Sequence, residues 1–290
     1  MTDVSVRRMT SADIDTTLRI QIDAFNDLAR RIGEDPGPVT DAQLERGRQR
    51  HEHFVKHDPD GVFVAERDGG VIGCALALRR DSLWGLSLLV VDPAVQSAGA
   101  GRRLLDASLT YSTGCSRAVI VASTDARAIR AYGTSGFDMY PQVKATGKPS
   151  LDDRHNTWRV REGSADDAAF ANEVDRQVRR AGRGPDHEMI ASNTMFVVDD
   201  ADGQGYAYMR DGNLYVLAAT NDEAAGALLW RCFETAATTD TPIEVDHITA
   251  EQQWAIRECL AARLDISNTG PVFWRGTSPP PSYLPSGAFL

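Results

Sequence analysis

Residues 90–105 read VVDPAVQSAGAGRRLL, in which an apolar run ends, the chain turns and a helix begins. Glycines at 99 and 101 stand at the predicted start of that helix. Backbone N–H groups in a first helical turn have no intrahelical partner, and the helix dipole adds positive potential there. Glycine lets a ligand approach the backbone without meeting a Cβ. The segment therefore predicts an anion site suited to a pyrophosphate.

Two other nucleotide motifs do not fit this segment. A dinucleotide-binding GxGxxG motif would need a third glycine where Leu104 stands. A P-loop needs Gly-Lys-Ser/Thr, but Gly147-Lys148 is followed by Pro149. A glycine pair at a helix start is common, so this motif alone leaves the function open.

A second motif follows one predicted strand later, where residues 125–137 read DARAIRAYGTSGF. Together the two segments resemble the GCN5-related N-acetyltransferase (GNAT) family. That family carries Gln/Arg-x-x-Gly-x-Gly/Ala at its phosphate loop and Ala-x-x-x-Tyr-x-x-x-Gly-Phe in the following helix. The matching positions are Gln96, Gly99, Gly101, Ala128, Tyr132, Gly136 and Phe137.

The resemblance implies acetyl-CoA as co-substrate and a direct attack of an amine on its thioester. The pantetheine arm would lie between two splayed strands, Leu86–Val91 and Ala118–Ser123. The amide of Val90 would polarise the thioester carbonyl, and Tyr132 would protonate the leaving sulfur. Asp125 stands where the family often has an asparagine that contacts the cofactor. An aspartate keeps the hydrogen-bond acceptor of that side chain and lacks its N–H donor. The residues expected to contact the cofactor are Leu89, Val90, Val91, Gln96, Ser97, Ala98, Gly99, Ala100, Gly101, Arg102, Asp125 and Tyr132.

The rest of the chain predicts a mixed α/β fold in two copies. Residues 61–80 read as a hairpin around Arg67-Asp68-Gly69-Gly70, and helical and strand patterns alternate on either side. The pattern restarts at Trp158, and the phrase Ser-Ala-Asp recurs at 11 and 164, which indicates an internal repeat. We expect a catalytic domain at 1–145, a linker at 146–157, a degenerate GNAT-like domain at 158–276 and a docked tail at 277–290.

The second copy has lost its motifs. Its late helix carries Cys259 where the first copy has Tyr132, and its phosphate loop, residues 220–226, contains two carboxylates. Negative charge there would repel a pyrophosphate by on the order of 1 kcal/mol per group. We therefore expect a structural role for this copy, extending the first domain's sheet or walling its acceptor pocket.

No general base is evident from the sequence. The run at 87–91 carries no carboxylate, and the residues His51, Glu52, His53 and His57 read more readily as a solvated helix face. Glu66, at the end of a hairpin strand, is equally open. The apolar tail ending at Leu290 suggests docking, with its carboxylate as a possible base.

Composition narrows the class of protein. The 290 residues carry a formal net charge of −10 and no basic run, which argues against nucleic acid and membrane surfaces as partners. Four cysteines without CxxC spacing predict no metal site and suit a reducing cytoplasm. The expected substrate is an amine on a small molecule or peptide, and the expected state a monomer or homodimer. The alternative is a non-catalytic acyl-CoA sensor or interaction module.

Overall fold

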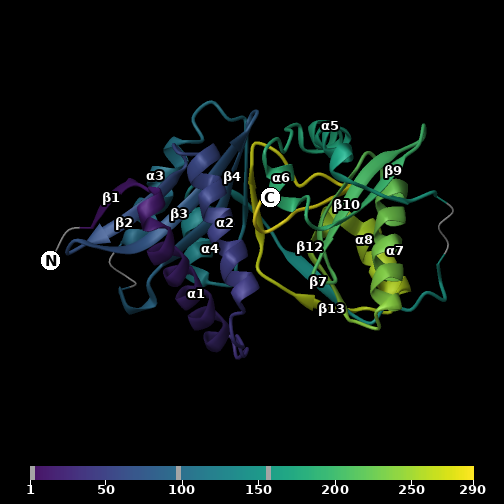
Figure 1. Cartoon of the computed structure of the whole chain (residues 1–290), viewed down its shortest axis with the longest axis horizontal. Helices are drawn as coiled ribbons and strands as arrows, with labels where there is room; N and C mark the ends of the chain where they lie inside the picture. Colours follow the sequence, from purple (N-terminus) through teal and green to yellow (C-terminus); the bar gives the residue numbers. More distant parts are fainter. Residues whose placement is uncertain (1–3, 96–98, 155–157) are drawn as a thin grey trace. The chain divides into compact units, whose positions relative to one another are not determined.

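The computed structural model describes residues 4–95, 99–154 and 158–290, which form two compact units (Figure 1). The first unit comprises residues 1–79 and 83–118, and the second comprises 80–82 and 119–290. Both combine strands with packed helices, so the predicted mixed α/β fold is confirmed.

The first unit is a sheet with strand order β1-β2-β3-β4 and three α-helices. β1 pairs antiparallel with β2, and β2 with β3 in the predicted hairpin. Helices α1 and α2 pack on each other, α1 also contacts β4, and α3 packs on β2 and β4. Its elements are β1 (Ser5–Arg8), η1 (Ser11–Asp13), α1 (Ile14–Arg31), α2 (Asp41–His57), β2 (Val62–Arg67), β3 (Gly70–Arg80), β4 (Leu83–Val91), η2 (Pro93–Val95) and α3 (Ala100–Thr110).

The second unit contains the remaining elements, and the boundary between the units falls inside β5. They are β5 (Arg117–Val121), α4 (Ala126–Gly133), β6 (Asp138–Tyr140), β7 (Gln142–Gly147), β8 (Arg161–Glu162), η3 (Ala165–Asp167), α5 (Ala168–Arg179), α6 (Asp186–Ile190), β9 (Thr194–Asp199), β10 (Gln204–Arg210), β11 (Asn213–Ala219), α7 (Asp222–Thr238), β12 (Ile243–Thr249), η4 (Ala250–Gln252), α8 (Gln253–Ala261), β13 (Asp265–Asn268), β14 (Val272–Arg275) and β15 (Tyr283–Leu284).

Strands from the two sequence copies are exchanged inside the second unit. β7, from the first copy, lies between β12 and β13 of the second and pairs antiparallel with both. β14, from the second copy, lies between β5 and β6 of the first. The compact units therefore differ from the ranges 1–145 and 158–276, because this pairing carries β5 to β7 into the second unit. The range expected as linker, 146–157, begins within β7.

The core of the second unit forms where α7 and α8 pack beside the sheets. α7 contacts β9, β10 and β11, and its buried side chains include Trp230 and Phe233, whose rings meet edge to face at 5.4 Å between centroids. Ala145 of β7 belongs to the same apolar cluster. The exchanged strand is thus part of this core, and its pairing buries backbone polar groups in hydrogen bonds.

Candidate active site

In the first unit, the end of β4 and the start of α3 build the predicted phosphate loop. Gly99 is the residue before α3 and has φ +80°, in the left-handed region that favours glycine. The first intrahelical bond there is from the N–H of Arg103 to the carbonyl of Gly99, at 3.1 Å. The amides of Ala100 and Gly101 precede that bond, so the backbone helix pattern does not use them.

Gly101 faces the end of β4. A Cβ built at Gly101 would lie 3.7 Å from Val91 Cγ2 and 3.9 Å from Leu89 Cδ2. Leu89 and Val91 are half-buried and alternate with buried Val90, as a strand requires. The first turn of α3 therefore lies beside the end of β4, the strand whose backbone was predicted to bind the pantetheine arm.

Of the other residues predicted for the phosphate loop, the structure describes Arg102. Gln96, Ser97 and Ala98 lie outside the described residues. Arg102 is exposed and pairs with Asp106 one turn along α3, at 3.0 Å. Arg102 thus has a side-chain partner on its own helix.

The equivalent position in the second copy is closed by side chains. Asn221 precedes α7, and its side-chain oxygen accepts a hydrogen bond from the N–H of Ala224 at 2.8 Å. Asp222, the first residue of α7, accepts from Ser282 Oγ at 2.6 Å. A capped helix start bearing a carboxylate is a poor pyrophosphate site. This contrasts with Gly99, which has no side chain to cap α3.

Tyr132 lies on α4 in the second unit and is buried, with 5% of its surface exposed. Its ring meets the ring of Phe273 on β14 edge to face, with 5.5 Å between centroids. Its hydroxyl makes no hydrogen bond to any of the residues that the structure describes. Burial, followed by the charge of Asp125, raises the pKa of Tyr132 above its usual range. The phenol is therefore protonated at neutral pH and has a proton to donate.

Asp125 caps α4, and its carboxylate is engaged within the chain. It accepts from the N–H of Arg127 at 2.8 Å and pairs with the guanidinium of Arg127 at 2.6 Å. Asp125 therefore acts as the cap of α4, and its contact with the cofactor stays a prediction.

The interpretation of His51, Glu52, His53 and His57 as a solvated helix face is wrong for two of the four residues, since Glu52 is exposed and His57 half-buried. His51 is fully buried and His53 is 6% exposed. The Nδ1 of His51 lies 2.9 Å from the carbonyl of Gly47, and burial lowers the pKa of His51 to about 4. The many charged residues of α2 made its buried side difficult to recognise from the sequence.

Sequence reasoning missed Arg50, which reaches from α2 to β4. Its guanidinium donates to the carbonyl and the Oγ of Ser87, each at 2.5 Å. Glu66, considered as a base, accepts from Arg7 at 2.9 Å. No motif signals either contact, because each joins residues far apart in the chain.

The tail is buried against the second unit. Tyr283 and Leu284 form β15, which pairs antiparallel with β11. Phe289 and Leu290 are 3% and 1% exposed. Arg183 donates to the carbonyl oxygens of these last two residues, at 2.9 and 3.1 Å. The chain's apolar end is therefore held by a buried arginine, and a catalytic role for Leu290 stays a prediction.

Two general features complete the site's description. Within residues 4–95, 99–154 and 158–290, no cluster of histidine, cysteine or carboxylate side chains could hold a metal ion. Over the same residues, no helix has the length and apolarity required to cross a membrane.

Comparison with known proteins gives both a family and a fold. Residues 22–137 match the family model described as the acetyltransferase (GNAT) family. A solved protein from Pyrococcus horikoshii shares the fold over 98% of this chain and 95% of its own, with a TM-score of 0.74 and 17% identity. A GCN5-related N-acetyltransferase from Kribbella flavida matches 94% of this chain and 71% of its own, with a TM-score of 0.60 and 17% identity. The search of curated proteins found no match.

Proposed function

We propose that the chain transfers an acetyl group from acetyl-CoA to a primary amine. Two findings support this proposal: residues 22–137 match the GNAT acetyltransferase family model, and the whole chain is similar in fold to the Pyrococcus horikoshii protein. The family uses acyl-CoA. The acceptor is an amine on a small molecule or a peptide, and the excess negative charge of the chain suits a cationic acceptor.

One observation carries this proposal: α3 begins at a left-handed glycine with no cap, whereas α7 in the second copy begins at a capped, acidic turn. The diphosphate of coenzyme A would accept hydrogen bonds from the main chain of residues 99–102 and be stabilised by the α3 dipole. The first copy alone would therefore hold the cofactor.

The proposed reaction needs three events. The neutral amine attacks the thioester carbon, so a C–N bond forms and an oxyanion develops, which the amide of Val90 would stabilise. The C–S bond then breaks and the sulfur leaves as a thiolate. The hydroxyl of Tyr132 donates its proton to that sulfur, and the amine proton is lost to a base or to water.

The proposal is tested by calorimetric titration of acetyl-CoA into a Gly101→Asp variant. The new Cβ meets only ordinary contact distances to Val91 and Leu89, and a carboxylate at a helix start favours the helix. We therefore expect unchanged thermal stability, with affinity for acetyl-CoA at least about tenfold weaker from repulsion and lost space. Thr113→Asp, exposed just beyond the end of α3, adds the same charge and should bind normally. Equal binding by Gly101→Asp would overturn the proposal.

A second candidate, a non-catalytic acyl-CoA sensor, is favoured by one observation. β4 reads LWGLSLLVV and brings no carboxylate to act as base. A panel of amines assayed for release of free thiol separates the two functions. Tight binding of acetyl-CoA with no thiol release across the panel would favour the sensor.

A further inference from the structure

Arg179, the last residue of α5, is a buried arginine whose guanidinium has no hydrogen-bond partner among the described residues. Its side chain is 1% exposed. Its nearest charged neighbour is Asp175, at 3.7 Å between Nη1 and Oδ1, which exceeds hydrogen-bond length. Its Cζ lies 5.6 Å from the centroid of the Tyr283 ring. A buried charge without a hydrogen-bond partner destabilises the fold unless a group of opposite charge binds it.

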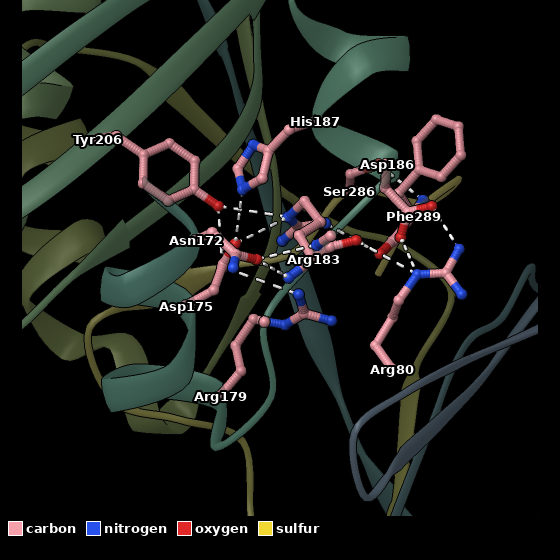
Figure 2. Close-up of polar contacts among 12 residues, drawn as sticks. Arg80, Asn172, Asp175, Arg179, Arg183, Asp186, His187, Tyr206, Ser286 and Phe289 are labelled. Atoms are coloured by element: carbon pink, nitrogen blue, oxygen red, sulfur yellow. Dashed lines mark hydrogen bonds and ion pairs between the residues drawn. The ribbon is translucent and has the colours of Figure 1, made fainter. Parts of the chain in front are cut away.

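The nearby carboxylate of Asp175 is already used by other groups. It accepts from the hydroxyl of Tyr206 at 2.8 Å and from Nε of Arg183 at 3.3 Å. The Nε2 of His187 lies 3.3 Å from Oδ2, the oxygen that also accepts from Arg183. Figure 2 shows these side chains and Arg179 gathered around Asp175. The Asp175 carboxylate therefore accepts hydrogen bonds from Arg183 and Tyr206 and none from Arg179.

The other acceptors in the neighbourhood are also committed. The Nη2 of Arg183 donates to Tyr283 Oη at 2.9 Å. The Arg80 guanidinium pairs with Asp186 at 2.6 Å (Figure 2) and also donates from Nε to the carbonyl of Arg183 at 3.2 Å. Arg179 and Arg183 thus face one side-chain carboxylate, and Arg183 also reaches the main-chain oxygens of Phe289 and Leu290. Arg179 is therefore the guanidinium that is left without an acceptor among the described residues.

We propose that Arg179 is the recognition group of a binding site for a small monocarboxylate in the second unit. The planar guanidinium fork matches a carboxylate through two parallel hydrogen bonds. The copy that has lost its coenzyme motifs would then retain a ligand-binding function of its own.

The test is calorimetric titration of acetate, propionate and benzoate into the full chain, in buffer free of other carboxylates, with chloride and phosphate as comparison anions. We expect one saturable site for at least one monocarboxylate. Arg179→Met should weaken that binding about tenfold or more, the factor for losing a charge-assisted pair of hydrogen bonds. Arg176→Met is the matched control, because Arg176 lies on the same helix, is 51% exposed and pairs with Glu173.

Thermal unfolding supplies a second readout. The bound monocarboxylate should raise the melting temperature of the wild type and of Arg176→Met, but not that of Arg179→Met. Should Arg179→Met fail to fold, Arg179→Lys keeps the charge and loses the fork, and it should bind the same anion more weakly. The proposal is overturned if no monocarboxylate binds saturably, if phosphate binds and the carboxylates do not, or if the Arg179 variants bind like the wild type. Binding of acetyl-CoA by these variants is measured in parallel, so that failure of the coenzyme site is recognised separately.

Discussion

Arg7 holds Asp13 through two parallel hydrogen bonds, of 2.9 Å to Oδ2 and 2.8 Å to Oδ1. Arg161 holds Asp167 in the second copy through the same two pairs of atoms. In both, the aspartate also accepts from the backbone of the residue that caps the short helix, Thr10 or Ser164. The shared motif shows that the repeat is preserved in atomic detail at a spacing of 154 residues.

Asp13→Asn should lower the free energy of unfolding by about 1–2 kcal/mol, because it breaks a charge-assisted pair at a side chain that is only 8% exposed. Asp167→Asn, where the side chain is 15% exposed, should cost less. Urea denaturation at pH 7 measures both. Hydrogen bonding to Arg7 outweighs burial and lowers the pKa of Asp13 to about 2. Its stabilisation is therefore present above about pH 4 and is lost as the pH falls toward 2. A larger loss in Asp167→Asn would contradict this ordering.

Tyr132→Phe should reduce kcat by about 10²-fold or more, with affinity for acetyl-CoA nearly unchanged. The fold should tolerate the change, because the hydroxyl bonds to no described residue and the ring contact with Phe273 remains. Since burial raises the pKa of Tyr132, activity limited by this acid should persist above pH 10 before declining. Thiol release and calorimetry test this together. Full activity in the variant would remove Tyr132 from the mechanism.

His51 should make the protein less stable in mild acid. Burial lowers the pKa of His51 to about 4, below the value near 6.5 of an unfolded chain. Between these values the unfolded chain binds a proton that the folded chain does not. The free energy of unfolding should thus fall by up to about 3 kcal/mol as the pH drops from 6.5 to 4.

Denaturation of His51→Gln at several pH values tests this effect. The variant should lose most of that slope, whereas His57→Gln, in which a half-buried histidine of the same helix is replaced, should keep it. Parallel profiles for the wild type and both variants would mean that His51 does not govern stability in acid.

Asp175→Asn should lower the free energy of unfolding by about 3–5 kcal/mol, because it removes the buried side-chain carboxylate that faces the charges of Arg179 and Arg183. Glu173→Gln, on the same helix and 59% exposed, should change stability little. Although burial alone would raise it, the pKa of Asp175 is lowered to about 2 by Arg183, His187 and Arg179. Its contribution is therefore kept above about pH 4. Urea denaturation measures both variants. A loss of unfolding free energy in Asp175→Asn as small as that in Glu173→Gln would show that the Asp175 charge does not stabilise the cluster.

Local patterns in the sequence predicted several features that the structure contains. The hairpin around Asp68 and the helix starts at 100 and 126 follow from turn residues and apolar spacing. The repeat was visible as Ser-Ala-Asp at 11 and 164, but the structural equivalence is shifted by one residue, with Thr10 matching Ser164. The shift was hidden because both serine and threonine can cap a helix, so Thr10 and Ser164 can occupy the same position.

Other features follow from contacts between distant segments, which no local pattern records. The exchange of β7 and β14 is one, since strand pairing uses backbone groups that every residue carries. The burial of His51 and Arg179 is another, because a histidine or arginine on a helix gives the same sequence pattern whether its side chain is buried or exposed. Along the chain, spacing and side-chain chemistry are enough to mark a helix start that can receive a phosphate and a tyrosine that can lose a proton. Which strands pair, and which charged side chains are buried, depends on packing between segments as much as about 150 residues apart, such as Ala122 and Pro271.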